Sequence, residues 1–252
     1  MSSTSNSTRE GLLSLTSELI RLAELRGTQI RALGGLGIAL RATDAHPALQ
    51  REFADIDVAA GKKSRRQVTE TMEEAGLEAE PGFNALQGSR RQIWWTPDHA
   101  THVDVFLGEF TMCHRLDLDD RLPADHPALA AADLLLMKLQ VVELNRKDVT
   151  DAASLLTTHR LDEHDDEGSI NRNRIVEILS SDWGFYTTAT DNLEKLPALV
   201  SGMDPELGLQ VAKAAAQIRE EVDAAPKSRA FKLRARVGRR KRWYEVPEES
   251  IT

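Results

Sequence analysis

Three aspartates in the first half of the chain have the type and spacing of a metal-binding carboxylate set. Asp55 and Asp57 flank Ile56 in an apolar run, and Asp104 lies inside the β-branched run 101–107. Because side chains alternate along a strand, Asp55 and Asp57 are predicted to share one face. A lone Asp-x-Asp is more typical of a solvated turn, but a buried third acid needs a cation or a metal. Since Mg²⁺ prefers oxygen ligands, the set indicates a site for Mg²⁺, with Mn²⁺ as a substitute.

A glycine pair precedes these acids. Residues 30–33 are predicted to form a short strand, Gly34 and Gly35 a turn, and residues 38–41 the start of a helix. Glycine lets a backbone approach a phosphate closely, and a helix N-terminus binds anions. This order of strand, glycine turn and helix predicts a phosphate site, although a plain tight turn fits the same residues.

The elements that must position these residues follow from the hydrophobic pattern. A helix is expected from Arg9 to near Gly27, and another from Ser64 to Gly76. The runs 90–95 and 101–110 predict a hairpin that places Asp104 beside the Asp55–Asp57 strand. Further elements are expected as follows: a turn at 82–88, a strand at 115–122, a polar loop at 159–168, and helices at 129–144, 147–158, 170–179, 193–200 and 205–222.

Composition limits the class of protein. The 252 residues are 41% hydrophobic and 29% charged, which is ordinary for a soluble globular chain. The polar start, MSSTSNSTREG, predicts no secretory signal, and no apolar run is long enough to cross a bilayer. The single cysteine, Cys113, excludes an internal disulfide and fits a reducing compartment. We therefore expect a cytoplasmic protein with no membrane partner.

The net charge of −8 hides an asymmetry. Residues 227–244 hold nine Lys and Arg and no acid, so removing these and the three Glu that follow leaves −14 on residues 1–226. Phe231, Trp243 and Tyr244 interleave with the cations, which suits RNA or single-stranded nucleic acid. Alternatively the basic segment pairs with the acidic remainder of the chain, and the size of that opposite charge favours this second interpretation.

Taken in order, these motifs resemble the nucleotidyltransferase superfamily and, within it, the AbiEii-like abortive-infection toxins. The residues that carry the resemblance are Gly34, Gly35, Arg51, Asp55, Asp57, Asp104, Lys138, Lys147, Asp148 and Asp151. The resemblance implies an α+β fold in which a nucleotidyltransferase-like mixed β-sheet flanked by helices is followed by an all-α C-terminal domain. The expected divisions are a polar tail and helix at 1–25, the nucleotidyltransferase-like domain at 26–127, a helical domain at 128–226 and a basic segment at 227–252.

The resemblance also implies an activity: Mg²⁺-dependent transfer of a nucleoside monophosphate from ATP or another NTP to a hydroxyl of tRNA, a protein or a small molecule. It implies a toxin with a cognate antitoxin as partner. The metal ligands implied are Asp55, Asp57 and Asp104. The catalytic residues implied are Asp55, Asp57, Asp104 and Lys138. The nucleotide-binding residues implied are Gly34, Gly35, Arg51, Lys147 and Asp148.

Other readings fit the same residues. A catalytically inactive protein of this fold could bind nucleic acid or a partner protein. A metal-dependent hydrolase could use His102, which shares a strand face with Asp104, but zinc would need further nitrogen or sulfur ligands. Lys138 could extend from its apolar helix to the surface, and Asp148 could complement a helix dipole.

Overall fold

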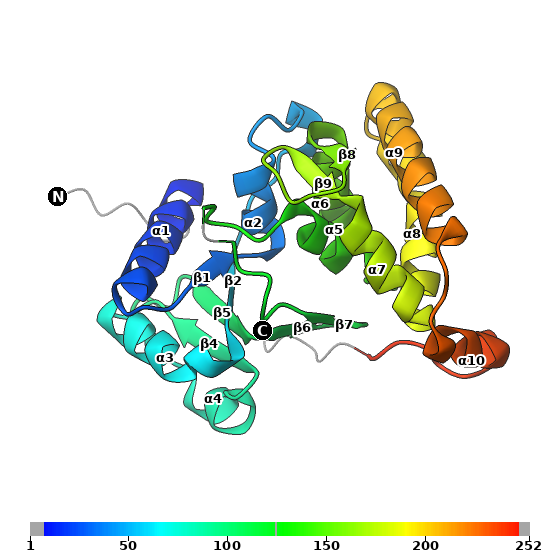
Figure 1. Cartoon of the computed structure of the whole chain (residues 1–252). Coiled ribbons are helices and arrows are strands. Elements are labelled where there is room, and N and C mark those ends of the chain that lie inside the picture. The colour runs from blue at the N-terminus through cyan, green and yellow to red at the C-terminus, as the bar shows by residue number, and fades with distance from the viewer. Residues whose placement is uncertain (1–7, 124, 247–252) are drawn as a thin grey trace. The chain divides into compact units, whose positions relative to one another are not determined.

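The computed structural model describes residues 8–123 and 125–246, and the chain forms two compact units. The first comprises Met1–Leu40, Glu52–Phe110 and Leu116–Ala130. The second comprises Arg41–Arg51, Thr111–Arg115 and Ala131–Thr252. Figure 1 shows their elements coloured along the chain. Each unit therefore draws on segments that are distant in sequence.

A five-stranded mixed sheet of order β1-β2-β5-β4-β3 forms the centre of the first unit. Its strands are β1 (Ile30–Ala32), β2 (Ile56–Ala60), β3 (Glu78–Ala79), β4 (Arg91–Trp95) and β5 (His102–Leu107). β2 and β5 run parallel, whereas β1–β2, β3–β4 and β4–β5 are antiparallel. The predicted hairpin is thus confirmed, and it places the strand of Asp104 next to the strand of Asp57.

One face of this sheet carries the core of the first unit. Apolar side chains at alternate positions of β2 and β5 are buried there together with α1 (Arg9–Leu25) and α3 (Arg65–Glu74), which Figure 1 shows beside the sheet. The main contributors are Leu12, Leu19, Ile56, Val58, Val68, Met72, Val103, Val105 and Leu107. Because strand residues alternate, Asp57 and Asp104 lie on the opposite face.

Two local predictions in this unit were wrong. The glycine pair does not precede a helix: α2 (Gly34–Arg41) begins at Gly34 itself. The turn expected at 82–88 is a helix, α4 (Pro81–Gln87), because proline at a first helical position starts a helix as readily as it marks a turn. The Asn84 side chain then bonds both backbone groups of Ile93 on β4.

Four shorter elements are also present. The strands β6 (Glu109–Thr111) and β7 (Arg115–Asp117) pair as a two-stranded sheet. The 3-10 turn η2 (Lys62–Ser64) belongs to the first unit, and the 3-10 turn η1 (Pro47–Leu49) belongs to the second. β7 is shorter than the strand predicted at 115–122.

The second unit is mainly helical, as predicted. Its helices are α5 (Ala131–Leu139), α6 (Arg146–Thr158), α7 (Arg172–Ser181), α8 (Trp183–Ser201), α9 (Pro205–Ala224) and α10 (Arg229–Val237), followed by the 3-10 turn η3 (Gly238–Arg240). Every residue of α5 except Lys138 is buried, so this helix forms the core. Figure 1 shows α9 alongside α8.

Two short strands also occur in the second unit. β8 (Arg160–Asp162) and β9 (Ser169–Asn171) pair in parallel. The expectation of a polar loop over 159–168 was therefore wrong at its start, because three-residue strands are too short to show an alternating pattern. The fold class itself is confirmed: a mixed sheet with flanking helices is followed by a mainly helical C-terminal part.

Within the described ranges, no helix combines the length and the apolar character needed to cross a bilayer.

Candidate active site

Asp57 and Asp104 are direct neighbours across the parallel strands β2 and β5, where their Cα atoms are register partners. Side chains at paired positions of parallel strands lie on the same face. Asp57 is half-buried and Asp104 is only 4% exposed, whereas Asp55 is exposed and lies just before the first residue of β2. The sheet therefore brings two of the three predicted carboxylates together, with the third at the start of the strand.

Gly34 lies against the Asp57 carboxylate. Its φ of +60° belongs to the left-handed region, and a Cβ at this position would collide with Oδ2 of Asp57. The N–H of Leu33 also donates to the Asp57 carbonyl oxygen at 2.9 Å. Glycine is thus required at position 34 for its backbone conformation and for the close approach of a side chain. The group that approaches Gly34 is a side chain of the same protein, not a phosphate. Phosphate binding by Gly34 and Gly35 therefore stays a prediction.

Asp104 has two partners on the same face, the arginine Arg91 and the titratable His102. Arg91 Nε donates to Oδ1 at 2.9 Å, and His102 Nε2 lies 3.3 Å from Oδ2. The Arg91 guanidinium also lies over the rings of Phe83 and Phe106, at 5.4 and 5.3 Å from their centroids. Cation–π contacts of this kind hold a guanidinium in a defined position. The buried carboxylate is therefore compensated within the protein.

These contacts shift two pKa values. Burial raises the pKa of Asp104, but the hydrogen bonds from His102 and Arg91 outweigh it, so the pKa lies below the usual value. The hydrogen bond to Asp104 raises the pKa of His102, burial opposes this, and the charges of Asp104, Asp55 and Asp57 raise it further. Asp104 is thus kept ionised, and His102 binds a proton more readily than an isolated histidine.

The donor set bears on whether this site can hold a resident metal. Carboxylates at positions 55, 57 and 104 have the chemistry that Mg²⁺ prefers. However, both oxygens of Asp104 already have partners, and over residues 8–123 and 125–246 no three His, Cys, Asp or Glu side chains are arranged to hold a metal ion. The residues as placed do not form a closed site for a resident ion. The carboxylates of Asp57 and Asp104 nevertheless lie side by side on this face.

Four other residues singled out by the sequence meet in the second unit. Arg51 makes a bidentate contact with Asp151 through Nε and an outer nitrogen, both at 2.7 Å. The Lys138 ammonium lies 2.9 Å from Asp151 and 3.2 Å from Asp148. Asp148 also forms a capping box with Asn145 at the start of α6. The result is an ion network in which each cation faces a carboxylate.

Lys138 is charged in this network. Burial lowers the pKa of Lys138, but Asp151 and Asp148 raise it by more, so it lies above the usual value. Lys147 is exposed on the first turn of α6 and belongs to none of these contacts. The observed partners give Lys138, Asp148 and Arg51 a structural role within the unit, and their nucleotide-binding or catalytic roles stay predictions.

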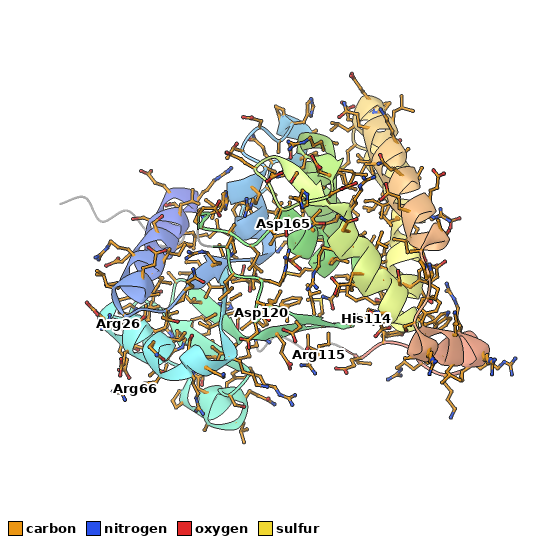
Figure 2. All side chains as sticks on the ribbon, viewed as in Figure 1. Arg26, Arg66, His114, Arg115, Asp120 and Asp165 are labelled. Carbon is orange, nitrogen blue, oxygen red and sulfur yellow. The ribbon has the colours of Figure 1, made fainter. Side chains whose placement is uncertain are left out.

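The pair Cys113–His114 has the environment of a core. His114 Nε2 lies 2.8 Å from Thr188 Oγ1, and its ring stacks on Phe185 at 5.0 Å between centroids. Figure 2 shows His114 beside the start of α8. Burial lowers the pKa of His114 to about 4 and raises the pKa of the buried Cys113 thiol. His114 is thus a neutral, packed histidine, and Cys113 is a protonated thiol.

The sequence did not identify Arg91 as a site residue. Arg90 and Arg91 are adjacent and chemically identical, and only the β4–β5 register selects Arg91 as the partner of Asp104. The alternation of side chains along the predicted hairpin could have identified Arg91, since it places Arg91, Ile93 and Trp95 on the same face as Asp104.

Comparison with known proteins adds little to this geometry. No family model matches the sequence, and no curated protein matches it. Part of the chain is similar to a solution structure of the antibiotic-resistance factor ANT(2'')-Ia, with 10% identity, a TM-score of 0.41, and coverage of 58% of this chain and 83% of that one. Another similar structure is the lincosamide antibiotic adenylyltransferase LnuA bound to lincomycin, with 16% identity, a TM-score of 0.40, and coverage of 56% and 94%. Likenesses this weak carry no conclusion about fold or function.

Proposed function

We propose that this chain is a nucleotidyltransferase that moves a nucleoside monophosphate from an NTP to a hydroxyl acceptor. The observation that supports the proposal is the adjacency of Asp57 and Asp104 on one sheet face, with Gly34 against the Asp57 carboxylate. Phosphoryl and nucleotidyl transfers depend mainly on positioning and charge neutralisation, so few further groups are required.

In this proposal the substrate is the Mg²⁺ complex of the NTP. The carboxylates of Asp55 and Asp57 would bind the divalent ion carried by the triphosphate, because such an ion prefers oxygen ligands. Such an ion neutralises charge on the phosphates and stabilises the pyrophosphate leaving group. The carboxylates proposed to coordinate this ion are those of Asp55, which is exposed, and Asp57.

Asp104 would act on the acceptor. It is ionised, and one of its oxygens would accept the proton of the acceptor hydroxyl as that oxygen bonds to the α-phosphorus. The bond from the α-phosphorus to the bridging oxygen then breaks, and pyrophosphate leaves. Arg91 and His102 would serve as positioning residues that hold Asp104. The acceptor we propose is a hydroxyl of tRNA, of a protein or of a small molecule. In the cell, we propose that the protein acts as a toxin that a cognate antitoxin inhibits.

The test uses each NTP labelled at the α-phosphate, Mg²⁺, and the three acceptor classes in separate reactions. We expect label transfer to one class, its loss with a chelator, and a loss of about 100-fold or more in Asp57→Asn and Asp104→Asn. Asp120→Asn is the matched control, because Asp120 is an exposed acid of the same unit (Figure 2). Transfer that persists in Asp57→Asn contradicts the proposal. Growth arrest on expression, lost in Asp57→Asn, tests the toxin role.

A catalytically inactive binding protein is the second candidate, and the pairing of Asp104 with Arg91 and His102 favours it. Absence of label transfer together with NTP or RNA binding would support this candidate. The hydrolase reading predicts phosphodiester or amide hydrolysis without any NTP. It has no metal cluster to support it in the described part of the chain.

A further inference from the structure

The basic segment, residues 227–244, is fixed to the second unit at both ends. At its start, the N–H of Ser228 donates to the carbonyl oxygen of Ser180 at 3.1 Å, and Ser228 caps α10. At its end, Trp243 Nε1 donates to Thr188 Oγ1 at 3.1 Å. The fold of the unit therefore sets where the charges of this segment lie.

Few of the nine cations in this segment have an anionic partner. Arg239 pairs with Asp191 at 2.7 Å, while Lys227 and Arg234 donate to backbone carbonyl oxygens. The other six are exposed and form no ion pair with any described residue: Arg229, Lys232, Arg236, Arg240, Lys241 and Arg242. Among the described residues, the acidic remainder of the chain therefore pairs with one of the nine cations, Arg239. Pairing with that remainder does not explain the other charges of the segment.

Aromatic rings order part of this charge. Three guanidinium groups lie over ring faces: Arg234 over Trp183 at 4.8 Å, Arg239 over Trp243 at 5.0 Å and Arg242 over Tyr244 at 5.9 Å. Figure 2 shows nitrogen-tipped side chains around α10. A guanidinium that is already held in place loses less conformational entropy when it binds an anion.

We infer that the basic segment is a binding surface for single-stranded nucleic acid. A nucleic-acid backbone presents a regular series of phosphates, which suits several exposed cations on a fixed support. Trp183, Trp243 and Tyr244 are half-buried beside these guanidinium groups, and bases stack on guanidinium planes as well as on the exposed part of a ring. The inference does not rest on the proposed nucleotidyl transfer.

An anionic membrane fits the segment less well. A helix that lies on a membrane turns its large apolar side chains outward into the lipid. In α10 the aromatic Phe231 is buried against the unit, and the exposed apolar residues are Leu233 and Val237. The outward apolar surface of α10 is therefore limited to two aliphatic side chains among many exposed cations, which favours a polyanion that remains in water.

The experiment measures binding of short labelled single-stranded RNA and DNA oligonucleotides by fluorescence anisotropy, without NTP, over a range of salt concentrations. The test variant is Arg229→Gln, Lys232→Gln, Arg236→Gln and Arg240→Gln combined. We expect affinity to fall at least about tenfold, and the slope of log K against log salt to decrease by roughly 0.7 per lost phosphate contact. The RNA and DNA arms decide which backbone is preferred.

The control variant combines Lys63→Gln, Arg65→Gln, Lys195→Gln and Lys213→Gln, which removes the same charge from exposed sites elsewhere. It is expected to bind as the parent does. An equal loss in both variants, unchanged binding in a folded test variant, or binding to phosphatidylserine vesicles but to neither oligonucleotide overturns the inference. The assay contains no NTP and measures no transfer, which separates its result from the fate of the proposed activity.

Discussion

The Nε atom of Arg91 donates a hydrogen bond to Oδ1 of Asp104 at 2.9 Å, on the sheet face opposite α1 and α3. Arg91 comes from β4 and Asp104 from β5, so the register of the hairpin creates the pair. A buried carboxylate without a cation is costly. Arg91 and His102 therefore make the position of Asp104 independent of any bound ion.

Replacing Arg91 tests this compensation. Arg91→Gln removes the guanidinium and leaves His102 beside Asp104, and is expected to destabilise the fold by about 1–3 kcal/mol. Urea denaturation measures the change. Arg90→Gln is the matched control, because Arg90 is exposed and its contact with Glu109 is long, at 3.9 Å. Equal stability of the two variants would show that the Arg91 contact contributes little.

The His102–Asp104 contact predicts a pH dependence. Because folding raises the pKa of His102, its protonated form stabilises the fold below the ordinary value of about 6.5, and this contribution is lost as pH rises through the folded pKa. Folding lowers the pKa of Asp104, so its contribution is present above about 3.9 and is lost as pH falls through the folded pKa. The difference in thermal midpoint between the parent and His102→Gln should be large below about pH 6.5 and shrink as the pH rises through the folded pKa of His102.

His164→Gln is the control for that series, because His164 is exposed in the loop between β8 and β9. Its thermal midpoint should track the parent across the same pH range. A parent–His102→Gln difference that stays constant with pH would contradict the assigned contact.

Gly34→Ala tests the close approach of Asp57. Gly27 and Gly34 both have positive φ, +67° and +60°, but nothing lies within 4 Å of a Cβ at position 27. Gly27→Ala should therefore cost about 1–2 kcal/mol, from the backbone alone. Gly34→Ala should cost about 1–3 kcal/mol more, because Asp57 must move. Chemical denaturation compares them, and equal losses would mean that the Asp57 carboxylate yields without cost.

Lys138→Met tests whether this lysine is structural. Removing its ammonium leaves the buried carboxylates of Asp148 and Asp151 with Arg51 as the remaining cation of the network, and is expected to cost about 3 kcal/mol. Lys147→Met, at an exposed position, should leave the free energy of unfolding unchanged. A stable Lys138→Met protein that has lost label transfer would instead support a direct catalytic role.

Local patterns predicted much of the fold. The alternation of apolar residues identified β2, β4 and β5, and helical spacing identified α1, α3 and most helices of the second unit. It failed at α4, where Pro81 and Gly82 suggested a turn, and at β8 and β9, which are three residues long. Such elements are also stabilised by hydrogen bonds to a neighbouring segment, as between Asn84 of α4 and Ile93 of β4, which local residue preferences do not reveal.

The sequence by itself determined that Asp57 and Asp104 each lie on a strand whose other face is apolar, because burial and period-two alternation are local properties of each run. The parallel pairing of β2 with β5 is what makes the two acids neighbours. Only the tertiary structure decided which partners these acids have. Strand register selected Arg91 over Arg90, and helix packing turned Lys138 toward Asp148 and Asp151. The physical reason is that the energy of a charged group depends on what lies within a few ångströms, and that neighbourhood is assembled from segments far apart in the chain.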